Sequence, residues 1–467
     1  MERSESVRSP WNFLLEAAEK YESYPAVFYG GNVWSYSDIK SMAGSLSEAI
    51  MDRFSVKKGD IIGVCLPQSV QSILSYFALW KKGLVPVPID SRLPVSAIDR
   101  IVSSGKISGI ITYEGLYSKI NREDTSSIFN LLTEPGDFLA HFQDPPEGFL
   151  IYRPKGTRQR AVLEESCYGE EGESEKIDPY TDPAIANIVW KSNGSFSIVK
   201  FTAGEVVEAS RKYMEKLISR ENSTFIQAHE PSDAQSVILS YIYPLHYGHG
   251  IGMESLYDEN DLKAVEKKYS SESSFIFNVN SCRSDFLRDV EKKERSQISL
   301  IFSRGIMGRH IIESLKEKRS SVFTLLCDEH LLVPLYWKQE SESGKFVRFI
   351  ENEEDVKLLE RDGNIMASGT MVSVSEDEYV KTDIFVTESG LEERIILDEN
   401  VIISLGKSYP VKDMEELIKN EMKIEDLKIV NDGKKIILKS SEKLNRKTLR
   451  EIFSRRVPPE IFRLIED

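Results

Sequence analysis

The strongest constraint on the fold is the alternation of helix-like and strand-like segments over the first 113 residues. Four segments carry apolar residues at helical spacing: 11–21, 37–50, 69–83 and 96–105. Three short apolar runs between them are typical of buried strands: 59–67, 84–90 and 107–113. Strands that are joined through helices need crossover connections, so this order predicts an α/β fold with a parallel sheet.

The alternation continues beyond an acidic, turn-rich stretch at residues 164–183, which we interpret as a solvated loop. Five further apolar runs predict strands: 186–190, 236–245, 273–279, 297–302 and 320–326. After about residue 340 the chain becomes charged and β-rich, and from about residue 399 it has a compact α+β pattern. We predict a large N-terminal domain with parallel or mixed sheets and a β-rich subdomain, residues 1–397, and a small C-terminal domain, residues 398–467.

Composition excludes some classes of function. The chain has 467 residues, which favours two or more domains, and a formal net charge of −15, which argues against a nucleic-acid partner and an anionic membrane surface. Its four cysteines form no CxxC pair, so we expect neither a zinc site nor a disulfide framework. We find no signal peptide and no apolar run of membrane-spanning length, and we expect a cytoplasmic protein.

The block from GDIIGVCLP onward resembles the N-terminal region of AMP-forming acyl-CoA synthetases, the adenylate-forming ligase superfamily. The matching residues are Gly59, Asp60, Pro67, Lys82, Gly83, Val87, Pro88, Ile89, Asp90 and Pro94. Weaker matches follow at Pro244 and Gly250, in YVKTDIF (379–385) and in DENVIISLGKSYPVKDMEEL (398–417). The resemblance implies a mobile C-terminal domain and a reaction that uses ATP and Mg²⁺ to make an acyl-adenylate, then coenzyme A to make a thioester.

The family's phosphate loop, approximately TSGTTGxPKG, matches Lys191–Lys200. By the resemblance, four residues of this segment suit an anion site: Ser192, Gly194, Ser195 and Lys200. One residue is deleted relative to the family, and Phe196 and Ile198 are bulky. Three interpretations stay open: a turn that joins a strand to a helix, an altered anion site, and a normal ATP loop.

Three acidic residues match other family positions. The resemblance assigns Glu329 to magnesium, with Asp328 beside it, Asp383 to the ribose hydroxyls and Asp398 to the interdomain hinge. A solvated loop acid or a turn-capping aspartate is the simpler alternative for each. The family's arginine near the hinge is replaced by Ile396.

The changed positions predict that the family reaction is impaired or lost. The family's C-terminal catalytic lysine is also expected beyond Asp467, where this sequence ends. We expect either a divergent acid–thiol ligase acting on a small carboxylate, or a pseudoenzyme that binds a nucleotide, an acyl group or coenzyme A, alone or as partner of an active ligase. A third alternative is an interaction protein that kept only the fold, because fold does not preserve function.

Overall fold

The computed structural model describes most of the chain. The described residues are 9–29, 32–117, 120, 129–133, 138, 163, 165–191, 193–216, 223–228, 231–253, 275–280, 298–304, 313, 321–339, 346–349, 356–361, 364–368, 380–387, 390–393, 396–397, 400–404, 407–431, 436–445, 447–449, 452 and 465–466. All statements below concern these residues.

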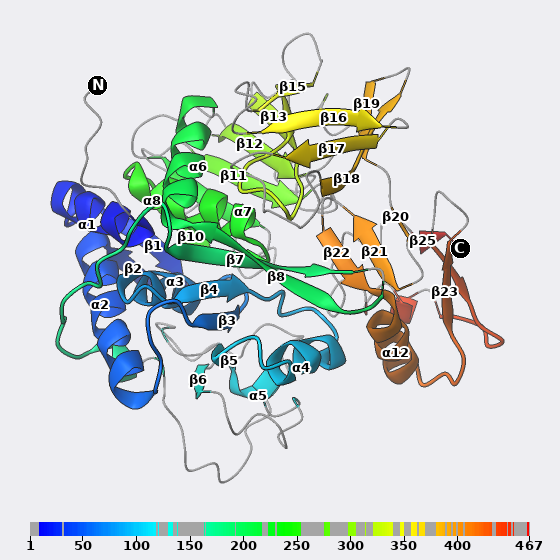
Figure 1. The fold of residues 1–467 in the computed structure, drawn as a ribbon, viewed down its shortest axis with the longest axis horizontal. Helices are drawn as coiled ribbons and strands as arrows, with labels where there is room; N and C mark the ends of the chain where they lie inside the picture. The colour runs from blue at the N-terminus through cyan, green and yellow to red at the C-terminus, as the bar shows by residue number, and fades with distance from the viewer. Residues whose placement is uncertain are drawn as a thin grey trace.

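A mixed nine-stranded sheet has the order β15-β14-β13-β12-β11-β9-β10-β1-β2 and extends from β1 and β2 at the left of Figure 1 to β13 and β15 at the top. Its inner strands pair in parallel and its outer pairs are antiparallel. The strands are β1 (Pro25–Tyr29), β2 (Asn32–Ser35), β9 (Thr224–Ala228), β10 (Gly250–Met253), β11 (Phe275–Asn280), β12 (Ile298–Arg304), β13 (Ser321–Leu326), β14 (Tyr336–Gln339) and β15 (Val347–Arg348). The strands expected at 273–279, 297–302 and 320–326 are therefore confirmed.

A second sheet has four parallel strands in the order β4-β3-β5-β6, as the early alternation predicts. The strands are β3 (Ile61–Cys65), β4 (Val85–Pro88), β5 (Gly109–Tyr113) and β6 (Phe129–Thr133). The helices of this region are α1 (Pro10–Tyr21), α2 (Tyr36–Arg53), α3 (Val70–Lys81), α4 (Val95–Ser103) and α5 (Glu114–Tyr117). Every residue of α3 is buried, which makes it the central helix of the N-terminal part.

The strand predicted at 186–190 is the end of β7 (Pro183–Trp190), which pairs with β8 (Phe196–Thr202) in an antiparallel hairpin. Helix α6 (Ala203–Lys216) follows β8 directly. Glu205 and Thr202 form a capping box: the Thr202 N–H donates to Glu205 Oε2 over 2.6 Å, and the Glu205 N–H donates to Thr202 Oγ1 over 3.3 Å.

The sequence predicts a strand over residues 236–245, and this prediction is wrong. The segment lies in a continuous helical run made of α7 (Ala234–Val237), the π-helical η3 (Ile238–Ile242) and α8 (Tyr243–His246). Asp233 begins it, because Asp233 Oδ1 accepts a hydrogen bond from the Ser236 N–H over 2.7 Å. The run is buried on all sides from Ala234 to Leu245, so its apolar pattern resembles that of a buried strand.

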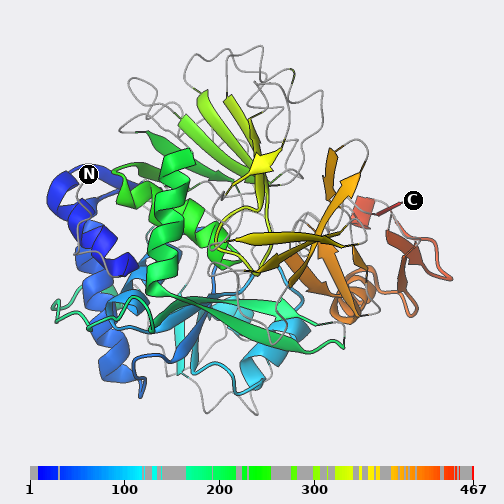
Figure 2. The same ribbon diagram turned by 45° about the horizontal axis from the view of Figure 1, so that its top comes forward.

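The last part of the chain forms three small sheets. An antiparallel sheet contains β16 (Lys357–Arg361), β17 (Asn364–Ser368), β18 (Val380–Thr387) and β19 (Gly390–Glu393). The next sheet contains β20 (Ile396–Leu397), β21 (Val401–Ser404) and β22 (Lys407–Pro410), and the third contains β23 (Lys428–Asn431), β24 (Ile436–Lys439) and β25 (Ile465–Glu466). Helix α12 (Val411–Met422) follows β22. The elements from β20 to β25, with α12, are called the C-terminal part below; they lie at one end of the molecule (Figures 1 and 2).

The C-terminal part has its own apolar core, which includes Tyr409, Met414 and Ile418. Apolar contacts join the two parts: Val401 packs in a core with Trp190 and Phe196, and Leu93 packs against the C-terminal core. The boundary at 397/398 stays a prediction. None of the helices in the described ranges is both long and apolar enough to cross a lipid bilayer.

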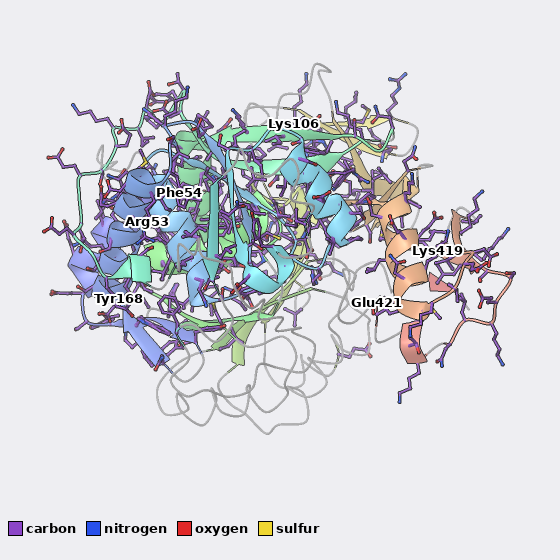
Figure 3. The ribbon with its side chains drawn as sticks, turned by 90° about the horizontal axis from the view of Figure 1, so that it is seen from below. Arg53, Phe54, Lys106, Tyr168, Lys419 and Glu421 are labelled. Carbon is purple, nitrogen blue, oxygen red and sulfur yellow. The ribbon has the colours of Figure 1, made fainter. Side chains whose placement is uncertain are left out.

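The acidic segment at residues 165–182 runs over the surface of α2 and α3, with residues 168–176 exposed. A short 3-10 turn, η2 (Glu165–Cys167), opens it, and Arg53 Nη1 donates to Ser166 Oγ over 3.2 Å. Figure 3 shows Arg53 and Tyr168 at the same end of the molecule, away from Lys419 on α12. Because Lys58 and Lys82 also donate to backbone carbonyls of Lys176 and Glu173, the loop predicted as solvated is attached to the helices below it.

Gly204 and Gly44 give a matched test of this packing. A Cβ at Gly204 would lie 2.6 Å from the backbone oxygen of Pro179, whereas a Cβ at Gly44 would meet the flexible Glu171 side chain at 2.9 Å. Alanine normally stabilises a helix relative to glycine by about 0.5–1 kcal/mol. We expect Gly204→Ala to lower the free energy of unfolding by about 1–3 kcal/mol through crowding, and Gly44→Ala to leave it unchanged or raise it. Urea unfolding of both variants measures this, and equal effects of the two substitutions would contradict the packing.

Candidate functional site

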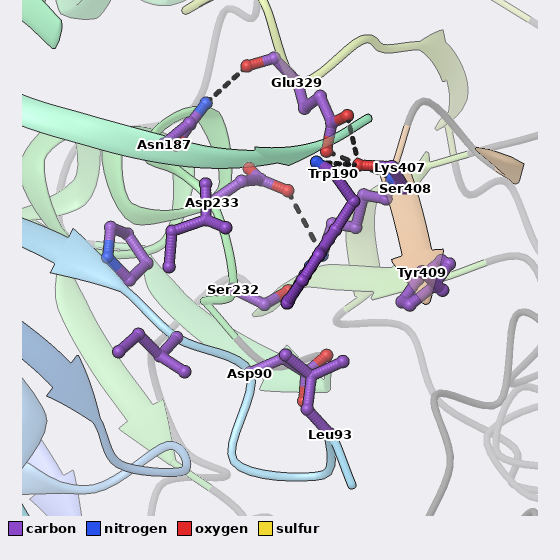
Figure 4. A pocket seen from close by; sticks show the side chains of 13 residues that line it. Asp90, Leu93, Asn187, Trp190, Ser232, Asp233, Glu329, Lys407, Ser408 and Tyr409 are labelled. Atoms are coloured by element: carbon purple, nitrogen blue, oxygen red, sulfur yellow. Dashed lines mark hydrogen bonds and ion pairs between the residues drawn. The ribbon is translucent and has the colours of Figure 1, made fainter. Parts of the chain in front are cut away.

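A pocket opens where the N-terminal sheets meet the C-terminal part (Figure 4). A water-sized molecule can occupy about 40 Å³ of it, within a wider space of about 430 Å³ that is partly open to solvent. The side chains that line it come from the ends of β4 and β7, the start of α7, the turn after β13, and β22: Pro88, Ile89, Asp90, Leu93, Asn187, Ile188, Trp190, Ser232, Asp233, Glu329, Lys407, Ser408 and Tyr409. Ligands of open α/β sheets commonly bind beyond the carboxyl ends of strands, which is where Asp90 and Glu329 lie.

Glu329 is buried and is held by the C-terminal part. Ser408 donates to both of its carboxylate oxygens: the backbone N–H to Oε2 over 3.1 Å and the hydroxyl to Oε1 over 2.6 Å. The Ser408 hydroxyl oxygen also accepts a hydrogen bond from the backbone N–H of Trp190 over 2.9 Å. Burial raises the pKa of Glu329 to about 7, against the opposing effects of His330 and of the Ser408 hydrogen bonds. Burial therefore favours the neutral form of this carboxyl group more than water does.

Asn187 fixes the backbone around Glu329. Its Nδ2 donates to the backbone oxygen of Glu329 over 2.6 Å, and its Oδ1 accepts from the Ala234 N–H over 2.7 Å. A single buried amide thus joins β7, the turn after β13 and the start of α7. Because both of these contacts involve backbone groups, the positions of Glu329 and Asp233 are coupled.

Lys407 forms the second polar contact between the hairpin β21–β22 and the pocket. Its Nζ lies 3.1 Å from Asp233 Oδ2 and also donates to Ser232 Oγ, and the Lys407 and Asp233 side chains are both more than nine-tenths buried. Asp233 uses its other oxygen to cap α7, so its orientation is fixed from both sides. The remaining acid, Asp90, binds Arg92 in bidentate form, with distances of 2.8 and 2.7 Å.

The charges around Asp90 lower its pKa. Burial acts in the opposite direction, but the Arg92 guanidinium and, more weakly, Lys407 outweigh it, so Asp90 is held below its usual range. The acids of the pocket therefore differ. Asp90 and Asp233 each have a cationic partner, whereas Glu329 is bound by neutral donors and has a raised pKa.

A further ion pair joins the two parts outside the pocket. Arg100 on α4 donates to both oxygens of Asp413 on α12, over 2.8 and 2.6 Å, and its guanidinium lies 4.9 Å from the centre of the Trp190 ring. Asp413 is only 2% exposed, whereas the Arg100 side chain is 40% exposed. Trp190 belongs to the N-terminal wall of the pocket. It contacts Ser408 and also Arg100, which in turn binds Asp413 on α12.

Among the described residues, Lys200, Gly194 and Ser195 do not line the pocket that contains Glu329. Lys200 is an exposed residue of β8 and does not line the pocket. Gly194 has a φ of +76° and Ser195 is exposed, with its N–H and hydroxyl both donating to Asn193 Oδ1. Lys191–Lys200 is therefore a turn followed by strand β8, and not a loop that leads directly to a helix, because Phe196–Thr202 pairs with β7.

The other predicted residues have mixed outcomes. Glu329 lines the pocket, but with its carboxylate bound by Ser408. Asp383 lies on β18, but its side chain, like Ser192 and Asp398 as a whole, is outside the described residues. His246 stacks on Phe13 at 3.5 Å between ring centroids, and burial lowers its pKa to about 3.

Sequence reasoning missed the polar residues that do line the pocket, above all Asn187, Asp233, Lys407 and Ser408. The D-x-x-S pattern of Asp233–Ser236 was a usable signal for a helix start, but the following apolar run was interpreted as a strand. Lys407 and Ser408 lie in a segment that the resemblance assigned to the hinge region, and nothing local in the sequence shows that they face Glu329 and Asp233.

The surroundings of Glu329 favour its neutral form over the ionised carboxylate that Mg²⁺ binds. Burial raises its pKa to about 7, and Ser408 donates a hydrogen bond to each of its oxygens. No cluster of three or more His, Cys, Asp or Glu that could hold a metal ion occurs among the residues that the structure describes.

Comparisons with known proteins confirm the resemblance to adenylate-forming ligases. Residues 14–164 match the model of the family described as AMP-binding enzyme. Curated relatives include surfactin synthase subunit 1 of Bacillus subtilis, 28% identical over 101 residues, and a probable non-canonical nonribosomal peptide synthetase of Salinispora arenicola, 25% identical over 162 residues. These matches cover 22% and 32% of this chain, but the chain spans only 3% and 2% of the length of those relatives.

Solved structures resemble nearly the whole chain. An o-succinylbenzoate CoA synthetase double mutant from Bacillus subtilis, bound to a product analogue, has a TM-score of 0.67 and 15% identity, and covers 98% of this chain and 95% of its own. A long-chain-fatty-acid-CoA ligase from Archaeoglobus fulgidus has a TM-score of 0.64 and 15% identity, and covers 98% and 97%. The Bacillus synthetase also has a structure in complex with ATP and magnesium, at 14% identity and a TM-score of 0.64, covering 96% and 94%. At these identities the likeness establishes the fold, which is α/β and of the adenylate-forming type.

The raised pKa of Glu329 predicts a pH dependence of stability. Because the pKa in the folded protein lies above its usual value of 4.5, this group's contribution is present at pH 4.5 and below and is lost as pH rises through about 7. A shift of this size corresponds to a loss on the order of 3 kcal/mol between pH 4.5 and 8. Urea unfolding of wild type and Glu329→Gln across this range isolates the effect.

The expected result is that the stability difference between Glu329→Gln and wild type changes in favour of Gln as pH rises. The exposed Glu416 supplies a matched control, since Glu416→Gln should show a constant difference. A constant difference for Glu329→Gln as well would mean that the carboxyl group titrates normally.

The Arg100–Asp413 ion pair predicts a second effect. Arg100→Ala leaves the buried Asp413 carboxylate without its guanidinium, and we expect the attachment of α12 to weaken by about 1–3 kcal/mol. Hydrogen exchange in Val411–Met422 should become faster, and Asp413→Asn in the same background should restore part of the protection. Arg211→Ala, which removes a surface contact to Glu208 at 3.9 Å, is the control, and the same acceleration there would contradict the assignment.

Proposed function

We propose that this chain is a divergent, adenylate-forming-type protein in which ATP-dependent activation of carboxylic acids is impaired or lost. Its function is then to bind a small ligand, as a non-catalytic relative of the AMP-forming acyl-CoA synthetases, alone or as partner of an active ligase. We also propose the division into residues 1–397 and 398–467 and a cytoplasmic location. ATP, Mg²⁺, AMP and coenzyme A are the ligands that the resemblance puts first.

The observation that carries the proposal is the bonding of Glu329. Both oxygens of the acid that the resemblance assigns to the metal accept hydrogen bonds from Ser408, so this carboxyl group is held by the C-terminal part. Lys200, which the resemblance assigns to phosphate, is exposed on β8 and does not line this pocket. Loss of a single charge-stabilising contact typically lowers kcat by roughly 10²–10³.

A divergent active ligase is the second candidate. It is favoured by the position of Glu329, which lines a pocket at the junction of the two parts of a fold that matches acyl-CoA ligases over 98% of the chain. In this case the hairpin β21–β22 would leave the pocket before Mg²⁺ and ATP bind. The two candidates differ in turnover and not in fold.

Pyrophosphate release from ATP and Mg²⁺ over a panel of carboxylic acids separates them. We expect no acid-dependent release above that of Glu329→Gln, together with calorimetric binding of AMP, ATP or coenzyme A without turnover. Acid-dependent release that Glu329→Gln abolishes would establish the ligase instead. If none of these ligands binds, the small-molecule function is wrong for this chain.

A further inference from the structure

Lys407 enters the pocket from the tip of a hairpin. Ser404 and Lys407 are the last paired residues of β21 and β22, so they flank the hairpin turn. From this position the Lys407 side chain lies against Ser232 and Asp233, and it is 8% exposed (Figure 4). Among the described residues that line the pocket, Lys407 supplies the only positive charge.

The three acids of the pocket differ in the groups that bind their carboxyl oxygens. Asp90 is neutralised by Arg92 in a bidentate pair, and Glu329 is hydrogen-bonded by Ser408. Asp233 is 5% exposed; one of its oxygens caps α7, and the other pairs with the ammonium group of Lys407. A buried carboxylate that loses its cation is strongly destabilised.

We propose that Lys407 is an autoinhibitory occupant of the pocket, so that docking of the hairpin β21–β22 and entry of a ligand exclude each other. This rests on the proposed function only in placing the ligand site at this pocket. Lys407 fills the space beside Asp233 with its own stem and ammonium group. The neighbouring Ser408 closes the opposite wall through Glu329 and Trp190, so withdrawal of the hairpin removes both contacts together.

The hairpin β21–β22 makes apolar contacts in two cores and polar contacts inside the pocket. Its strand β21 packs with Val401 in the core around Trp190, whereas Tyr409 on β22 packs in the C-terminal core. The contacts inside the pocket are polar: two hydrogen bonds to Glu329, one from Trp190 and the Lys407 pairs. Breaking a hydrogen bond that water or a ligand group can replace costs less free energy than removing side chains from a packed apolar core.

Chemical rescue tests the occupancy of the pocket by Lys407. Lys407→Ala removes the atoms from Cγ to Nζ, which are the atoms of propylammonium. We expect the variant to unfold at a lower temperature than wild type, and propylammonium chloride to raise its Tm in a saturable manner. Sodium chloride at the same ionic strength and neutral propanol should have no such effect. Wild type should show no saturable response, because its own lysine fills the site.

Two variants complete the design. Lys412→Ala, an exposed lysine on α12, should behave as wild type. Lys407→Ala with Asp233→Asn should lose the response to propylammonium, since Asn keeps the helix cap but not the charge. An equal response in all variants, or no response in Lys407→Ala, would overturn the proposal.

If Lys407→Ala does not fold, Asp233→Asn alone replaces it. In that variant the exchange of backbone amides in Lys407–Pro410 should become faster than in wild type, and unchanged exchange would overturn the proposal. Neither experiment uses ATP, AMP or coenzyme A. The inference about Lys407 can thus fail while nucleotide binding holds, and the reverse.

Discussion

The pair of hydrogen bonds from Ser408 to Glu329 is the contact on which the arrangement of the pocket depends. It joins the turn after β13 to β22, and through the Trp190 N–H it also reaches β7. Asn187 then connects the same turn to the start of α7, where Asp233 meets Lys407. The C-terminal part therefore supplies one wall of the pocket. If this wall moves, the polar groups that face the pocket change.

Burial and charge have different consequences for each acid. The net charge of the chain is −15, yet Asp90, Asp233 and Asp413 each have a specific cationic partner in or near the pocket. Glu329 lacks such a cation at hydrogen-bond distance among the described residues, and burial raises its pKa. The acid with the strongest family assignment to a metal is thus the one that the fold keeps closest to neutral.

Much of the fold could be predicted from the sequence because its signals are local. The strands β3, β4 and β5 and the helix α3 follow from short apolar runs and from helical spacing. The helical run Ala234–His246 could not, since a helix that is buried on every side has no polar face to set its period. The hairpin β7–β8 was interpreted as a strand and a loop, because pairing partners are tertiary information.

The candidate site was less predictable than the fold. Glu329 was identified through the resemblance, but its bonding to Ser408 joins residues 79 positions apart. Lys407 and Ser232 are separated by 175 positions, and no local pattern relates them. For Asp233, the local sequence contains only the D-x-x-S pattern that is typical of a helix start.

Hydrogen exchange of the peptide that contains Ser408, followed by mass spectrometry at pH 6, tests the docking of the hairpin most directly. The account predicts slow exchange in wild type and faster exchange in Glu329→Ala. Exchange in wild type as fast as in an unfolded peptide would show that the hairpin does not close the pocket and would contradict the account.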